Sequence, residues 1–152
     1  HRAVARREPL GYLVLVADGV HNFIGGLAVA GAFLVDLRVG LVAWVAAAAH
    51  EVPQELGDFG ILVHAGWSRR RALVYNLLSA LTFLLGGWLA YALSGRFEVT
   101  WLLPFAAGNF VYIAAADLLP ELSAGPAGGR KILLTAVFAL GLGLLTLVAV
   151  VV

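Results

Sequence analysis

Cysteine is absent from this 152-residue sequence, and charged residues are scarce. Without cysteine the chain can form neither a disulfide framework nor a thiolate metal site, so nitrogen and oxygen atoms would have to hold any metal. Only 12% of the residues are charged, against about a quarter in soluble domains. The net charge is +1, and the basic residues form short clusters instead of one amphipathic face. We therefore expect no nucleic-acid partner.

Apolar residues are abundant: 62% of the chain is hydrophobic, and its mean hydropathy is +0.95. A transmembrane helix needs roughly 20 apolar residues to cross a hydrocarbon core about 30 Å thick. Five stretches meet this length, at residues 10–36, 41–64, 72–94, 100–122 and 132–152. Short polar connections separate them. The sequence predicts an all-α fold, a polytopic transmembrane helix bundle of about five helices in a lipid bilayer.

The distribution of basic residues predicts the orientation of the bundle. Eight of them fall on one side: Arg2, Arg6, Arg7, Arg69, Arg70, Arg71, Arg130 and Lys131. Only Arg38 and Arg96 fall on the other side. Because loops rich in Lys and Arg stay in the cytoplasm, we expect a cytoplasmic N-terminus and, after five crossings, an external C-terminus. We also expect residues 1–152 to form one transmembrane domain, the C-terminal part of a longer protein.

Six of the nine acidic residues lie within the predicted spans or near their ends. They are Asp18, Glu51, Glu55, Asp58, Asp117 and Glu121. A charged side chain near the bilayer centre costs roughly 2.5 to 3.5 kcal/mol on insertion scales. These carboxylates therefore need a cation, a proton or water to compensate them. The alternative is that the carboxylates are protonated or face a cavity and only hold helices together, which suits one isolated acid better than six.

Histidines on the first two spans reach the same depth. These spans run antiparallel, so His21 and His50 both arrive near the middle of the membrane and could face each other. On the second span, His50 and Gln54 share one helical stripe, and Glu51 and Glu55 share the adjacent stripe. The pattern predicts a cation site of imidazole, carboxylate and amide groups. Asn76 and Ser79 of the third span are interpreted as interhelical hydrogen-bond partners.

Acidic residues between this site and the cytoplasm predict an exit path for the cation. They are Asp18, Asp58, Asp117 and Glu121.

Four segments resemble one known family. Asp18-Gly-Val-His-Asn-Phe-Ile-Gly-Gly and His50-Glu-Val-Pro-Gln-Glu-Leu-Gly-Asp-Phe look like the paired metal-binding helices of ZIP transporters. Asn76-Leu-Leu-Ser-Ala-Leu-Thr and Ala107-Gly-Asn-Phe-Val-Tyr-Ile-Ala-Ala-Ala-Asp-Leu-Leu-Pro-Glu extend the resemblance over nearly the whole chain. The five predicted spans resemble the fourth to the eighth of that family's eight helices.

The resemblance implies transport of a divalent metal toward the cytoplasm, with zinc as first choice and iron, manganese or cadmium as alternatives. The implied metal ligands are His21, Asn22, His50, Glu51, Gln54 and Glu55, at two adjacent metal positions. No prosthetic group is implied. The implied location is the plasma (inner) membrane, with the missing N-terminal helices of the same protein and, by analogy, a second copy in a homodimer as partners.

The sequence departs from the family pattern at three positions. Gly25 stands where the family usually has an acidic ligand, and Gln54 where many members have a second His or a bridging Glu. Phe83 stands where some members have a Glu. We therefore expect fewer metal ligands than is usual in the family.

Two other functions fit parts of the pattern. His50-Glu51 begins the H-E-x-x-H zinc motif of metallohydrolases. Gln54 replaces the second His, however, and Pro53 would distort the helical turn, so we expect no enzymatic activity. A metal-gated channel or a proton-coupled carrier would also use buried acids and histidines.

Overall fold

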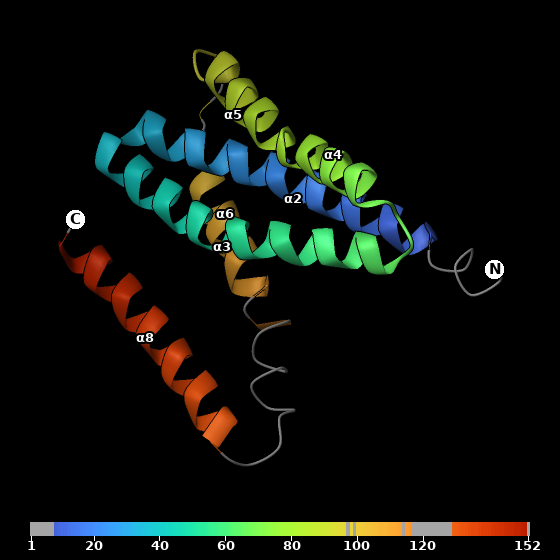
Figure 1. Ribbon diagram of the computed structural model, residues 1–152. Helices are drawn as coiled ribbons and strands as arrows, with labels where there is room; N and C mark the ends of the chain where they lie inside the picture. The colour runs from blue at the N-terminus through green and yellow to red at the C-terminus, as the bar shows by residue number, and fades with distance from the viewer. Residues whose placement is uncertain (1–7, 97, 99, 114, 117–128, 152) are drawn as a thin grey trace. The chain divides into compact units, whose positions relative to one another are not determined.

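The computed structural model describes residues 8–96, 98, 100–113, 115, 116 and 129–151 (Figure 1). In this part of the chain all regular secondary structure is helical. The chain forms two compact units, residues 1–103 and 104–152. The first unit holds α2 (Glu8–Val35), α3 (Leu37–His64), α4 (Arg69–Ala80) and α5 (Thr82–Leu93), and the later helices are α6 (Leu102–Ile113) and α8 (Gly129–Val151). The prediction of an all-α fold is confirmed.

Among the described residues, two segments are long and apolar enough to cross a membrane, Pro9–Val35 and Arg69–Leu93, and Lys131–Leu144 is a shorter apolar helix segment. Large apolar side chains such as Leu13, Val16 and Leu84 are more than half exposed. An apolar exterior around a polar interior is the arrangement of a helical membrane bundle, because lipid is as apolar as leucine.

The connection between α2 and α3 is a single residue, Asp36. One carboxylate oxygen of Asp36 accepts hydrogen bonds from the backbone N–H groups of Arg38, at 2.8 Å, and Val39, at 3.4 Å. This N-cap satisfies donors that a helix start otherwise leaves free. Helix α3 therefore begins at Leu37, and the predicted loop over residues 36–40 is shorter than expected.

The third predicted span consists of two helices in succession, α4 and α5, which meet at Leu81. The Thr82 hydroxyl donates toward the carbonyl oxygens of Ser79, at 2.7 Å, and of Gly19 on α2, at 2.6 Å. The Ser79 hydroxyl donates to the Asn76 carbonyl at 2.9 Å. Hydroxyl groups that bond carbonyls of the preceding turn compete with the regular helix pattern. We attribute the break at Leu81 to these contacts.

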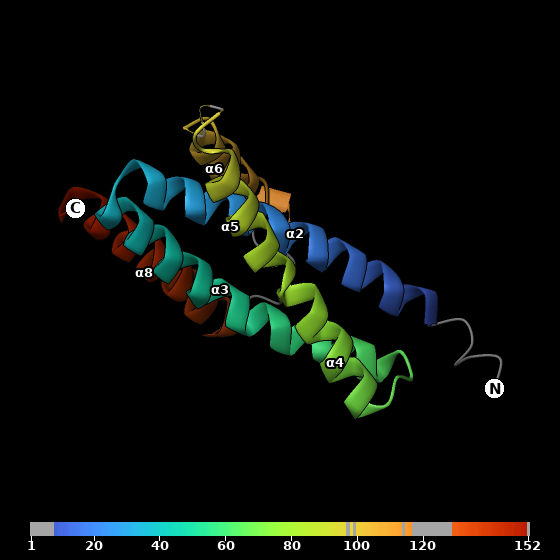
Figure 2. The same cartoon turned by 90° about the horizontal axis from the view of Figure 1, so that it is seen from above.

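Helix α2 packs against α3, α4 and α5 (Figures 1 and 2). Its contact with α5 brings the two backbones together at glycines. A Cβ atom added to Gly26 would lie 1.9 Å from the Phe83 carbonyl oxygen, and one added to Gly86 would lie 2.0 Å from the Phe23 carbonyl oxygen. Only glycine allows this approach, which is a common device for packing membrane helices.

The end of α3 packs on the start of α4 through a small apolar cluster of Leu62, Ala65, Trp67 and Ala72. Gly66 has a φ of 97°, in the left-handed region that glycine adopts without strain. The Ser68 hydroxyl then caps α4 by accepting from the Arg71 N–H at 3.3 Å. The turn places α4 against both α2 and α3, where Asn76 reaches Glu55.

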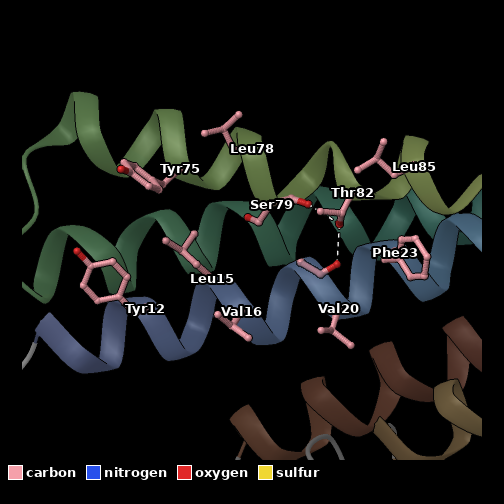
Figure 3. A pocket seen from close by; sticks show the side chains of 11 residues that line it. Tyr12, Leu15, Val16, Val20, Phe23, Tyr75, Leu78, Ser79, Thr82 and Leu85 are labelled. Atoms are coloured by element: carbon pink, nitrogen blue, oxygen red, sulfur yellow. Dashed lines mark hydrogen bonds between the residues drawn. The ribbon is translucent and has the colours of Figure 1, made fainter.

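An open groove of about 560 Å³ lies between α2 and the α4–α5 pair (Figure 3). Apolar side chains form most of its walls, among them Leu15, Val20, Phe23 and Leu85. Its polar groups are the hydroxyls of Tyr12, Tyr75, Ser79 and Thr82. Because imidazole and carboxylate groups are missing from its lining, this groove offers no metal site. The polar cluster described next has different residues.

Candidate metal site

His21 of α2 and His50 of α3 lie face to edge, with ring centroids 5.7 Å apart and ring planes at 72°. Oxygen Oε1 of Glu51 lies 3.2 Å from Nε2 of His21 and also 3.2 Å from Nε2 of His50. All three side chains are partly buried. The three atoms therefore converge from two helices on one point. The structure brings together these three residues of the expected ligand set.

The spacing of these atoms suits a tetrahedral zinc ion. Zinc–nitrogen and zinc–oxygen bonds are about 2.1 Å long, which gives a tetrahedron with edges of about 3.4 Å. The two separations from Glu51 to the histidines, 3.2 Å each, are close to this edge length, and all three atoms lie within 4.8 Å of one another. A zinc ion could bind all three atoms after small side-chain adjustments and would keep its fourth position for another ligand or water.

The backbone orients one of the two imidazoles. Nδ1 of His50 lies 2.9 Å from the Ala46 carbonyl oxygen, which can only accept, so Nδ1 carries the proton. In the neutral ring Nε2 then presents a lone pair toward the carboxylate of Glu51. Two lone pairs face each other favourably only when a cation or a proton lies between them. A backbone contact of this kind is the usual support of a metal-binding histidine.

Beside the histidines, on the side nearer the N-terminus of α2, side-chain amides donate hydrogen bonds to the carboxylates of Asp18 and Glu55. Nδ2 of Asn22 donates to Oδ1 of Asp18 at 2.8 Å and to Oε1 of Glu55 at 3.4 Å. Nε2 of Gln54 donates to the same oxygen of Asp18 at 3.3 Å. Asp18 and Asn22 are each only 3% exposed. The remaining expected ligands, Asn22, Gln54 and Glu55, thus lie together with Asp18, which the sequence placed in the exit path.

Asn76 of α4 is a member of this cluster whose position there the sequence did not reveal. It is 6% exposed, and its Nδ2 donates to the Glu55 backbone carbonyl at 3.0 Å and to Oε2 of the Glu55 side chain. The sequence interpretation as an interhelical hydrogen-bond partner gave no target for the bond. Its position in a segment that resembles the ZIP family was the sequence signal that could have indicated a role at this cluster.

In the part of the chain that the structure describes, two groups of donor atoms result, and each has its atoms within 4.8 Å of one another. His21, His50 and Glu51 form the first, and Asp18, Glu51 and Glu55 form the second. Asp58 is partly buried further along α3 and belongs to neither group. Asp117 and Glu121 lie outside the described residues. The ligand roles and the exit path therefore remain predictions.

Two of the three departures from the family pattern are neighbours in space. A Cβ atom on Gly25 would lie 3.5 Å from the ring of Phe83, in ordinary van der Waals contact. A glycine and an apolar ring therefore meet at these two positions, and neither residue offers an oxygen ligand.

The chain is similar to known proteins along most of its length. The chain matches the family described as ZIP Zinc transporter over residues 1–149. It is 46% identical to the mouse zinc transporter ZIP4 over 122 residues, which are 80% of this chain and 18% of that protein. It is 40% identical to the zebrafish metal cation symporter ZIP14 over 151 residues, which are 95% of this chain and 30% of that protein.

A third relative, the Drosophila melanogaster zinc transporter ZIP13 homolog, is 44% identical over 121 residues, which are 76% of this chain and 34% of that protein. The chain thus spans between 18% and 34% of the length of these three relatives. No solved structure matches the chain. From the family match over nearly its whole length, the chain belongs to the ZIP zinc transporter family.

Proposed function

We propose that this chain carries the transport site of a divalent-metal transporter that moves zinc across a membrane toward the cytoplasm. The observation that carries the proposal is the convergence of His21, His50 and Glu51 on one point between α2 and α3. Relatives named as zinc transporters support it. Because these relatives are named as transporters, we also propose that the protein has no enzymatic activity.

The donor set favours zinc as the cargo. Two imidazole nitrogens and one carboxylate oxygen suit zinc better than purely oxygen-binding cations. Three protein ligands leave one position open, and a transport site must release its ion as readily as it takes it up. Asn22, Gln54 and Glu55 complete the ligand set in the proposal, and Fe²⁺, Mn²⁺ and Cd²⁺ are the competing cargoes.

We infer the orientation of the protein in the membrane, and the exit path, from the distribution of charged residues. We place the site in the plasma (inner) membrane, with the basic side of the bundle in the cytoplasm. Asp18, Asp58, Asp117 and Glu121 then lead from the site toward that side. Residues 1–152 form the C-terminal transmembrane domain, which the remaining helices of the same protein and a second copy in a homodimer complete.

Metal uptake into proteoliposomes containing the full-length protein tests this proposal. We expect saturable zinc uptake that His21→Ala and His50→Ala each reduce at least about tenfold, because each removes a nitrogen ligand. His64→Ala is the matched control, since His64 is an exposed histidine at the end of the same helix. Uptake that does not saturate with zinc would favour a channel. If both site variants took up zinc as well as the parent, the transport site would not lie between α2 and α3.

A further inference from the structure

The groove between α2 and the α4–α5 pair continues, at one of its ends, into a cluster of aromatic and basic side chains. We propose that this groove binds one anionic phospholipid of the bilayer, with an acyl chain along its apolar walls and the headgroup phosphate on Arg71. Tyr12 and Tyr75 belong to both parts, because they line the groove and also contact Arg71. The lining contains none of the metal-site residues, so this inference does not depend on the proposed transport function.

Three aromatic rings hold the side chain of Arg71. Its guanidinium carbon lies 3.9 Å from the centre of the Trp67 ring, and 5.8 Å from the ring centres of both Tyr12 and Tyr75. Its Nη2 donates to the Tyr12 hydroxyl at 2.6 Å. Trp67 is only 4% exposed, so the ring beneath the guanidinium is fixed in place. A guanidinium is a planar fork of N–H donors that matches phosphate, and here its orientation is set before a ligand binds.

Two further arginines make this end of the groove strongly positive. Arg69 and Arg70 directly precede Arg71 at the start of α4, and both are exposed. Tyrosine and tryptophan side chains are typical of the level of lipid headgroups, and basic pockets between membrane helices bind anionic headgroups. An apolar helix would cover the groove walls but would not use these charges. Charge complementarity therefore favours an anionic lipid as the occupant.

The length of the groove matches one leaflet of a bilayer. Along α2 the groove extends from Tyr12 to Phe23 (Figure 3). The two residues are 11 positions apart, which corresponds to about 16 Å of helix. Half of a hydrocarbon core about 30 Å thick is about 15 Å. With the phosphate on Arg71 at headgroup level, an acyl chain in the groove would end near the middle of the bilayer, as chains of that leaflet do.

The walls of the groove suit an acyl chain. Val16, Val20 and Leu78 are each more than half exposed and give it an apolar surface. The Ser79 hydroxyl already donates to the Asn76 carbonyl, and the Thr82 hydroxyl donates to the carbonyls of Gly19 and Ser79. Because these hydroxyls are satisfied within the protein, an acyl chain can cover them without the cost of an unpaired polar group.

Lipid binding to the full-length protein in detergent micelles tests the inference, with native mass spectrometry as the readout. The protein is titrated with dioleoyl phosphatidylglycerol and, separately, with dioleoyl phosphatidylcholine, which has the same chains and no net charge. We expect the parent to bind one phosphatidylglycerol at least about fivefold more tightly than phosphatidylcholine, because basic residues at the membrane surface attract anionic lipid.

Substitutions of Arg71 test the headgroup contact. Arg71→Gln should remove most of the preference for phosphatidylglycerol. Arg71→Lys keeps the charge but loses the planar fork, so it should retain part of that preference. Arg38→Gln is the matched control, since it removes one exposed arginine at the other end of α3 and should bind like the parent.

A bulky side chain in the groove tests the position of the acyl chain. Val16→Trp should weaken phosphatidylglycerol binding at least about fivefold, because the indole ring would occupy the apolar space that the chain needs. Leu13→Trp is the matched control: Leu13 lies on the same helix, outside the groove lining, and is 65% exposed against 66% for Val16. It should bind like the parent.

Three results would overturn the inference. Equal affinity of the parent for the two lipids would exclude recognition of the headgroup by Arg71. Parental lipid binding by Val16→Trp would mean that another helix of the protein, or a second copy, covers the groove. Losses in the two control variants as large as those in Arg71→Gln and Val16→Trp would assign the effects to the protein surface in general.

Discussion

The polar cluster between α2 and α3 has two halves, and the hydrogen bonding of the side chains differs between them. Around His21, His50 and Glu51, acceptor atoms face one another without an amide donor between them. Around Asp18 and Glu55, the amides of Asn22, Gln54 and Asn76 donate to the carboxylates. The first half needs a cation or a proton to be stable, whereas the second is partly satisfied without one. An ion should therefore order the first half more than the second.

Glu51 belongs to both halves, so Glu51→Gln should have the largest effect. An amide keeps the shape of the side chain but removes its charge and one acceptor, and both groups of donor atoms lose a carboxylate. We expect zinc affinity to fall at least about tenfold. Competition with a chromophoric chelator measures the zinc affinity. Parental zinc affinity in Glu51→Gln would show that Glu51 is not a primary ligand.

Substitutions of the two histidines in the first half and of Asn22 in the second half should separate nitrogen from oxygen ligands. His21→Ala and His50→Ala remove zinc's preferred donors, so we expect a large loss of zinc affinity and a smaller change for Mn²⁺. Asn22→Ala removes a weaker oxygen donor and should lower zinc affinity less than either histidine variant. Isothermal titration calorimetry provides the ranking. A larger effect in Asn22→Ala would reverse the assignment of the primary ligands.

The glycine-mediated packing of α2 on α5 bears on the second half, because α5 follows directly after the helix that carries Asn76. A methyl group at Gly26 would collide with the Phe83 backbone. We expect Gly26→Ala to destabilise the fold by about 1 to 3 kcal/mol, the usual cost of overpacking. Gly57→Ala is the matched control, since nothing lies within 4 Å of its added Cβ atom. Thermal unfolding in micelles compares the two variants.

Restoring the family's usual ligands should give a smaller effect of opposite sign. A Cβ atom at Gly25 would lie 3.5 Å from the Phe83 ring, in ordinary van der Waals contact. We therefore expect Gly25→Asp combined with Gln54→His to tighten zinc binding and to slow its release. Zinc affinity and the maximal uptake rate should move in opposite directions. A double variant that binds zinc no better than the parent would show that these positions lie outside the site.

Sequence periodicity predicted most of the fold because apolar length and charge clusters define membrane helices directly. The pairing of His21 with His50 could also be predicted, since two antiparallel spans fix the depths of their residues. The contact of Asn76 with Glu55 could not be predicted, because it depends on how α4 is rotated about its own axis. The break at Leu81 arises from a hydroxyl contact between helices, which helical periodicity does not encode. The adjacency of Gly25 and Phe83 likewise required the packing of α2 on α5.

Because the turn at Asp36 is a single residue, the number of residues between Asp36 and each histidine determines whether the two imidazoles meet. His21 lies 15 residues before Asp36 and His50 lies 14 residues after it. At 1.5 Å per residue, the two imidazoles are each about 21 to 23 Å from the turn, which is why they meet. One residue inserted between Asp36 and His50 would move that histidine by about 1.5 Å along α3 and turn it by about 100° around the helix. Insertions and deletions in this hairpin should therefore be as damaging to metal binding as the loss of a ligand.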